Sequence, residues 1–259
     1  MSWWTTVLGG AVGFMLGGPL GAMLGVAFAG NFSKRRSSFG GLGGNFNRGD
    51  QQRVQAAFFS SVFSVMGYLA KVDGKVSKSE ILLAQQVMQQ LQLTEDMQKV
   101  AKDLFNQGKS NDFNLDEVLE QFRVESHRRT NLIRMFLEIQ IQATYADGVL
   151  DNTERDALKY IAEKLHFPIH ELENLIQQFS ATSGKVSKLS IDDAYVILDA
   201  DKSLNDKEIK RVYRRLLAQH HPDKLVAKGL PEEMRKIAKE KTQEIISAYE
   251  LIKEQRGMR

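Results

Sequence analysis

The sequence predicts an all-α protein with three parts: an N-terminal transmembrane helix, a helical bundle and a C-terminal helical hairpin. Three observations predict this class. Residues 2–33 contain no Asp, Glu, Lys or Arg, and from Arg53 onward apolar residues recur with helical rather than alternating spacing. The whole chain contains only 4 prolines, which favours long helices because proline interrupts them.

The composition narrows the possible functions. The chain has 259 residues, of which 42% are hydrophobic and 26% charged, as in ordinary globular proteins. Its 35 basic and 32 acidic residues nearly balance, so we expect no nucleic-acid partner. Because there is no cysteine, disulfides, thiolate metal ligands and a thiol nucleophile are excluded.

Residues 1–33 are expected to form a membrane anchor, because a span needs only about 20 apolar residues. A cleaved secretory signal is the alternative, since Ala27 and Ala29 resemble a cleavage site. No basic residue precedes the apolar stretch, whereas Lys34, Arg35 and Arg36 follow it. This order favours an uncleaved single-pass anchor, with the short N terminus outside and the bulk of the chain in the cytoplasm.

Glycines recur at every fourth position within the predicted span, so they form a stripe on one helix face. Small residues let membrane helices approach closely, and we expect a homodimer through this stripe. The alternative is that glycine is simply common in membrane helices. Residues 34–52 are rich in glycine and predict a flexible linker. The stripe consists of Gly9, Gly13, Gly17, Gly21 and Gly25.

Residues 53–180 are expected to form a compact helical bundle. The first helix has an apolar face from Val54 to Leu69, and a second includes Val87 and Met88. Further helices are predicted over residues 97–105, 115–122, 131–146, 154–165 and 170–179. The expected core contains Phe58, Phe59, Phe63, Phe105, Phe122, Phe136 and Phe179.

Two segments of the bundle resemble each other: AKVDGKVSKSE at residues 70–80 and TYADGVLDNTE at residues 144–154. Their Asp-Gly pairs and final Glu residues are in register, which suggests two similar helical halves. Helix capping is the favoured explanation, because the spacing lacks the successive acids of an EF-hand loop. A divalent cation is the alternative. Its candidate ligands are Asp73, Glu80, Asp147 and Glu154.

These repeated Asp-Gly turns and Glu residues resemble the TerB-like domain associated with tellurite resistance, over residues 53–179. The resemblance implies the helical fold more than any activity.

Residues 181–189 read as a polar connector, and residues 190–259 as a terminal domain. Ser190 with Asp193, and Asn205 with Glu208, have the spacing of capping boxes that begin helices. The helix after Asn205 is rich in Lys and Arg and is expected to end before Pro222. Residues 234–254 return to helix and are expected to pack against it.

The sequence QHHPDKL places a His-Pro-Asp tripeptide between these two helices. We expect no metal site, because only His220, His221 and Asp223 cluster there. We also expect no general base, because a hairpin is too small to enclose a substrate and offers no nucleophile. Recognition by another protein and an ordinary turn remain open. His220 itself is expected to be exposed or to have its polar atoms satisfied.

The sequence RVYRRLLAQHHPDKL, followed by QEIISAYELIKEQ, resembles the J-domain of DnaJ-type co-chaperones. With the anchor and the TerB-like domain, the chain is similar to membrane-anchored DnaJ-like proteins. The resemblance implies a regulatory co-chaperone of the bacterial inner membrane, not an enzyme, that needs no cofactor and stimulates the ATPase of a DnaK-type chaperone. The alternative is an envelope-stress or metal-responsive scaffold with a secondary J-domain. The implied partner-binding residues are Lys210, Arg211, Tyr213, Arg214, Arg215, His221, Pro222 and Asp223.

Overall fold

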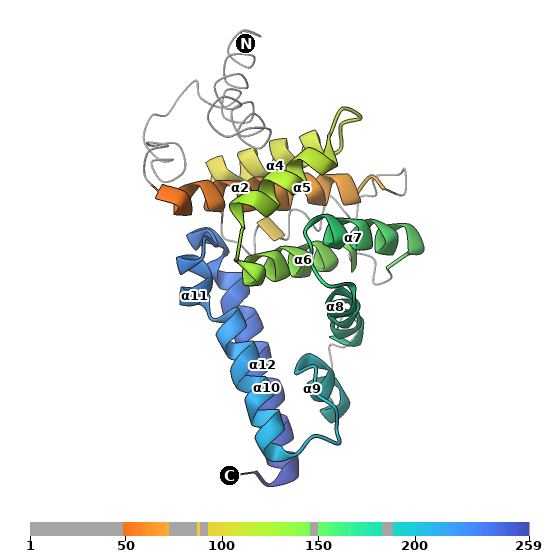
Figure 1. The fold of residues 1–259 in the computed structure, drawn as a ribbon, viewed down its shortest axis with the longest axis vertical. Coiled ribbons are helices and arrows are strands. Elements are labelled where there is room, and N and C mark those ends of the chain that lie inside the picture. Colours follow the sequence, from red (N-terminus) through yellow and green to blue (C-terminus); the bar gives the residue numbers. More distant parts are fainter. Residues whose placement is uncertain (1–48, 73–86, 89–92, 146–149, 183–188, 259) are drawn as a thin grey trace.

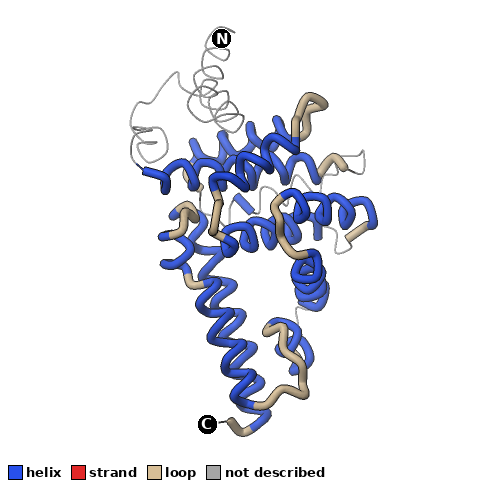
Figure 2. The backbone as a smooth tube through the Cα atoms, viewed as in Figure 1, coloured by secondary structure: helices blue, strands red, loops and turns tan. Residues whose placement is uncertain are grey.

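The structure is a computed structural model that describes residues 49–72, 87–88, 93–145, 150–182 and 189–258. Within these ranges the regular structure is entirely helical, which confirms the predicted all-α class (Figure 2). The elements are α2 (Gly49–Leu69), α4 (Glu95–Gly108), α5 (Leu115–Glu125), α6 (Thr130–Thr144), α7 (Asn152–Lys164), α8 (Ile169–Thr182), α9 (Ile191–Ile197), α10 (Asp206–His220), α11 (Pro222–Ala227), the 3-10 turn η2 (Glu232–Met234) and α12 (Arg235–Arg256).

The predicted anchor and its glycine stripe lie outside the described residues, as does nearly all of the predicted linker. Among the helices that the structure does describe, none combines the length and the apolarity required to cross a membrane.

Helices α2 and α4 to α8 form the bundle, in which α2, α4 and α5 pack together above α6 and α7 (Figure 1). Helices α2 and α4 cross in close contact at two glycines. A Cβ atom on Gly67 would lie 2.0 Å from the Phe105 carbonyl oxygen, and one on Gly108 would lie 1.8 Å from that of Ser64. The two backbones therefore touch at this crossing, and neither position has room for a side chain.

Aromatic rings fill the space between the layers, as the sequence predicted. The rings of Phe58 and Phe122 meet edge to face at 5.9 Å, and Phe122 lies 4.9 Å from Phe136. Edge-on and tilted contacts of this kind stabilise a core beyond the area they bury. All seven predicted phenylalanines are buried except Phe179, which packs against the core while partly exposed.

The predicted helix bounds hold to within a few residues where the structure describes them. Helix α2 begins at Gly49, four residues before the expected start. Helix α7 begins with a capping box, in which the Asp151 side chain accepts from the Glu154 backbone N–H and the Glu154 side chain accepts from the Asp151 N–H. Such reciprocal bonds satisfy two donors that a helix start leaves free.

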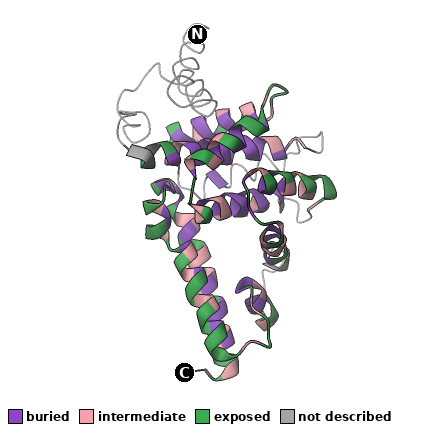
Figure 3. Ribbon diagram, in the orientation of Figure 1, coloured by how far each residue is buried: buried purple, intermediate pink, exposed green. Residues whose placement is uncertain are grey.

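Helices α9 to α12 form the terminal domain. Both predicted capping boxes are present: Ser190 with Asp193 begins α9, and Asn205 with Glu208 begins α10. Helices α10 and α12 lie antiparallel and extend away from the bundle, with α9 beside them (Figure 1). Their facing residues form a small core of their own, while the opposite faces are exposed (Figure 3).

Arg256, near the end of α12, connects this helix to α9 and to the segment between α9 and α10. Its guanidinium donates to the Tyr195 hydroxyl at 2.5 Å, to the Leu204 carbonyl at 2.7 Å and to the Lys202 carbonyl at 2.6 Å. The connection between α9 and α10 is therefore fixed to α12 by one side chain.

The sequence does not predict helix α11, because it indicates helix only up to Pro222 and again from residue 234. Pro222 occupies its first turn, where the missing N–H costs nothing because that donor would have no partner. The helix has six residues, too few to show a period in the sequence. It lies at the end of the hairpin that meets the bundle (Figure 1).

Candidate functional site

His221 lies at the junction of α10 and α11, where it is both the last cap of one helix and the first cap of the next. Its backbone is extended, with φ −58° and ψ 122°. The Asp223 backbone N–H donates to His221 Nδ1 over 3.2 Å, which leaves Nε2 pointing away from this bond. The side chain is exposed, so the ring is oriented by the cap while its outer edge stays accessible.

The side chain of Asp223 is held by a contact from α12, the other long helix of the hairpin. Its carboxylate forms an ion pair with Arg235 at the start of α12, and both side chains are more than half exposed. Exposed pairs of this kind add little to stability. The side chains of His221 and Asp223 are therefore ordered by short contacts within the terminal domain, and their polar atoms remain at the surface.

The basic face of α10 also lies at the surface. Ile209 and Leu216 are buried in the hairpin core, and the cationic residues between them are exposed. None of these four cations forms an ion pair with any residue that the structure describes. Several unpaired positive charges on one helix attract an acidic surface. The basic face consists of Lys210, Arg211, Arg214 and Arg215.

Tyr213, the remaining residue implied by the resemblance, contacts the opposite helix instead of pointing fully outward. Its ring stacks on Tyr249 of α12 with centroids 3.9 Å apart and planes 7° from parallel. Partial burial raises the pKa of the Tyr213 hydroxyl. The ring therefore contributes to packing of the hairpin, and only part of it is available to a partner.

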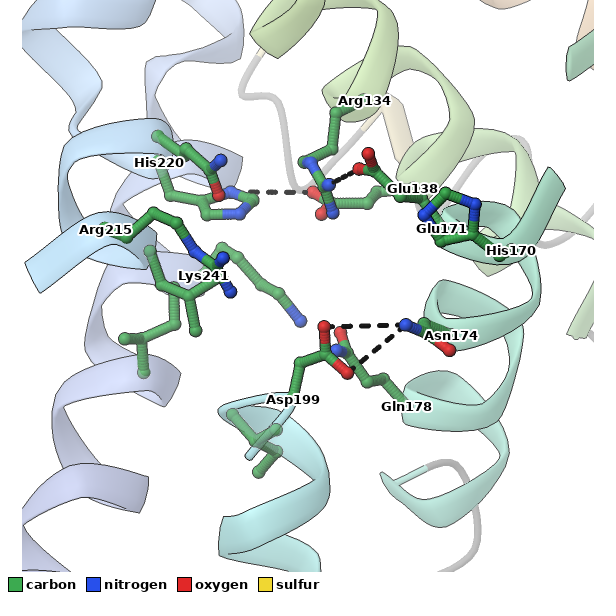
Figure 4. A pocket seen from close by; sticks show the side chains of 14 residues that line it. Arg134, Glu138, His170, Glu171, Asn174, Gln178, Asp199, Arg215, His220 and Lys241 are labelled. Carbon is green, nitrogen blue, oxygen red and sulfur yellow. Dashed lines mark hydrogen bonds and ion pairs between the residues drawn. The ribbon is translucent and has the colours of Figure 1, made fainter. Parts of the chain in front are cut away.

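Sequence reasoning missed a polar cavity between the bundle and the terminal domain (Figure 4). Its volume is about 220 Å³, and residues of α6, α8, α9, α10 and α12 line it. On its wall, His220 Nδ1 lies 3.7 Å from Glu138 Oε2, and both side chains are buried. Neither His220 Nδ1 nor Glu138 Oε1 has a hydrogen-bond partner among the residues that the structure describes.

An exposed His220 is therefore ruled out, because the residue is buried, and its Nδ1 has the ion-pair contact with Glu138 but no hydrogen bond among the described residues. Burial lowers its pKa, with Lys241 and Arg134 acting in the same direction and Glu138 opposing them. One signal in the sequence could have placed it: His220 follows Leu216 by four residues and so lies on the buried face of α10.

The predicted cation ligands are only partly within the structure. Glu154 belongs to the capping box of α7, as the favoured explanation required. Asp73, Glu80 and Asp147 lie outside the described residues. Among the residues that are described, no group of three acidic or histidine side chains is placed to hold a metal ion.

Three family models match consecutive parts of the chain. Residues 1–43 match the co-chaperone DjlA transmembrane domain, residues 60–177 match tellurite resistance protein TerB, and residues 193–257 match the DnaJ domain. No solved structure matches the chain significantly. The fold, the exposed tripeptide and these matches define a J-domain co-chaperone with a TerB domain and a membrane segment.

Curated relatives match along the whole length. The chain is 40% identical to the co-chaperone protein DjlA of Coxiella burnetii and 39% identical to that of Salmonella typhimurium, covering all of both proteins. It is 41% identical to DjlA of Shewanella oneidensis over 85% of this chain and 86% of that protein. The chain belongs to the DjlA family of co-chaperones.

Proposed function

We propose that this chain is a membrane-anchored regulatory co-chaperone that stimulates ATP hydrolysis by a DnaK-type chaperone. One observation carries the proposal: a single hairpin presents both an exposed His-Pro-Asp tripeptide and four cations without an ion-pair partner among the described residues. The family membership supports it, because a J-domain is the part of a co-chaperone that acts on such a partner.

In this proposal the basic face makes the first contact. Lys210, Arg211 and Arg214 meet an acidic surface of the partner, and the Coulomb attraction raises the rate of encounter. Arg215 joins them at the edge of the interdomain cavity, which it also lines. The hairpin then places His221, Pro222 and Asp223 against the partner, whose own active site hydrolyses ATP. No residue of this chain contacts the reacting phosphate.

Asp223 changes its cation when the partner binds. In the free chain its carboxylate is paired with Arg235, and an exposed pair costs little to separate. A cation of the partner takes the place of Arg235. Pro222 limits the conformations of the loop, so little conformational entropy is lost on binding.

The membrane part of the proposal rests on residues outside the described structure. Residues 1–33 cross the bacterial inner membrane once, with Lys34, Arg35 and Arg36 on the cytoplasmic side, where ATP and the partner are found. The glycine stripe from Gly9 to Gly25 joins two copies. In-membrane cross-linking of wild type and of Gly17→Leu and Gly21→Leu tests this interface, and an unchanged dimer yield would argue against it.

Charge reversal tests the basic face directly. The full chain in detergent, with Arg211→Glu and Arg214→Glu, is expected to need at least about tenfold more protein for half-maximal stimulation of the DnaK ATPase, with weaker dependence on salt. Lys99→Glu, on α4 of the bundle, is the control for a general charge effect. Equal activity of both variants would contradict the proposed docking surface.

A further inference from the structure

The segment that follows the tripeptide belongs to the core of the bundle and not to the core of its own domain. Four apolar residues after Asp223 are buried within the large bundle cluster, whereas the rest of the terminal domain forms the small cluster between α9, α10 and α12. The four residues are Leu225, Leu230, Met234 and Ala238. The terminal domain is therefore docked on the bundle by the segment that directly follows its His-Pro-Asp tripeptide.

Gly229 shows how close this docking is. Its φ is +106°, a conformation that other residues rarely adopt. A Cβ atom at this position would lie 2.5 Å from Val54 Cγ1 of α2 and 3.5 Å from Leu132 Cδ1 of α6. The backbone after α11 therefore lies directly against two helices of the bundle.

Two side chains of the bundle and one of α12 also hold the backbone on both sides of the tripeptide. The final carbonyl groups of a helix have no partner within the helix. Asn131 Nδ2, at the start of α6, donates to the Gln219 carbonyl at 3.3 Å. Thr242 of α12 donates to the His220 carbonyl at 3.0 Å, and Gln51 of α2 donates to the Val226 carbonyl at 3.2 Å.

We propose that Asn131 is a positioning residue for the co-chaperone reaction, because its bond to Gln219 fixes the end of α10 from which His221 and Asp223 reach the partner. The proposal rests on the proposed function for its consequence in ATP hydrolysis. It makes the TerB-like bundle part of the activating surface: the bundle sets the geometry of the tripeptide, while the basic face of α10 provides the binding energy.

The variants that test this proposal form a matched set. Asn131→Ala removes the amide, and Asn131→Asp keeps its shape but loses the N–H donor. Asn174→Ala is the control. Like Asn131, Asn174 is an asparagine of the bundle that donates a hydrogen bond to the terminal domain over 3.3 Å. Its acceptor is the side chain of Asp199, which follows α9 and lies far from the tripeptide in the chain. Only the Asn131 variants are expected to disturb the tripeptide.

The first measurement is single-turnover ATP hydrolysis by DnaK over a range of concentrations of the full chain. Both Asn131 variants are expected to lower the maximal stimulation by about 2- to 10-fold, the factor that one lost hydrogen bond represents. The half-maximal concentration is expected to stay within about twofold of wild type, because the basic face is unchanged. The proposal would be overturned if both Asn131 variants kept the wild-type maximal stimulation, or if Asn174→Ala lowered that maximum equally. It would also be overturned if the Asn131 variants changed only the half-maximal concentration.

The second measurement needs no partner chaperone. Hydrogen exchange of residues 219–229 is expected to speed up in Asn131→Ala and to stay at the wild-type rate in Asn174→Ala. Unchanged exchange in Asn131→Ala would overturn the positioning by itself. If the wild-type chain failed to stimulate DnaK, the proposed function would fail, while this measurement would still decide whether Asn131 fixes the segment.

Discussion

His220 Nδ1 of α10 lies 3.7 Å from Glu138 Oε2 of α6, across the boundary between the terminal domain and the bundle. Both side chains are almost fully buried, with 3% of the His220 surface and 6% of the Glu138 surface exposed. His220 directly precedes the tripeptide in the sequence. The pair therefore places the Glu138 carboxylate of the bundle next to the end of α10, which the His-Pro-Asp tripeptide directly follows.

Stability is expected to fall in mild acid because of His220. Burial lowers its pKa below the ordinary 6.5, so the unfolded chain takes up this proton first as the pH falls. The contribution of His220 to the free energy of unfolding is therefore largest above pH 6.5 and declines as the pH drops from 6.5 toward the folded-state pKa, by at most about 1.4 kcal/mol per pH unit. His220 faces Glu138 and Arg134 from α6 and Lys241 and Glu244 from α12.

Urea unfolding of wild type and of His220→Gln between pH 5 and pH 8 measures this effect. The unfolding free energy of wild type minus that of His220→Gln is expected to decrease toward acid pH, because only the histidine takes up a proton on unfolding. A difference that stays constant across the range would show that His220 does not gain a proton on unfolding.

Removing Arg235 is expected to leave the fold intact and to release Asp223. The pair is more than half exposed on both sides, so Arg235→Ala should change the free energy of unfolding by less than about 1 kcal/mol. Because Asp223 then has no ion-pair partner among the described residues, the half-maximal concentration for DnaK stimulation should fall. Lys236→Ala is the control, because it removes the exposed contact to Glu240. Reduced stimulation in Arg235→Ala alone would contradict this prediction and would mean that the partner needs Arg235 itself.

Adding a methyl group at the crossing of α2 and α4 is expected to be costly. The Cβ of Gly67→Ala would lie 2.0 Å from the Phe105 carbonyl oxygen, so the helices must separate, at a cost of about 1–3 kcal/mol or more. Gly257→Ala is the comparison, since it has φ +64° but nothing within 4 Å, and backbone strain alone costs about 1 kcal/mol. Equal midpoints for the two variants in urea unfolding would contradict the close crossing.

Local features of the fold could be predicted because a few neighbouring residues determine them. The capping boxes at Ser190 and Asn205 each join residues only three positions apart, and both are present. The phenylalanine core follows from helical spacing in the same way. The His-Pro-Asp tripeptide and its basic helix are likewise continuous in the chain, so the sequence shows that they lie close together, while their role in binding a partner stays a prediction.

Contacts between distant segments could not be predicted. Gly67 and Gly108 are ordinary glycines in the sequence, and only the packed structure shows that each faces a carbonyl group. Leu225 and Leu230 lie in a stretch without helical period, so nothing local indicated that they pack into the bundle. Docking of the terminal domain, and with it the contact of Asn131 to Gln219, depends on surfaces about ninety residues apart in the chain.

The central claim is that the tripeptide activates a partner ATPase, and steady-state ATP hydrolysis by purified DnaK with the full chain tests it most directly. His221→Asn keeps a side chain that caps α11, and His221→Gln does not, so the pair separates capping from recognition. The wild-type chain is expected to raise the DnaK turnover rate, and both variants are expected to fold yet fail to raise it. Undiminished stimulation by either folded variant would contradict the account.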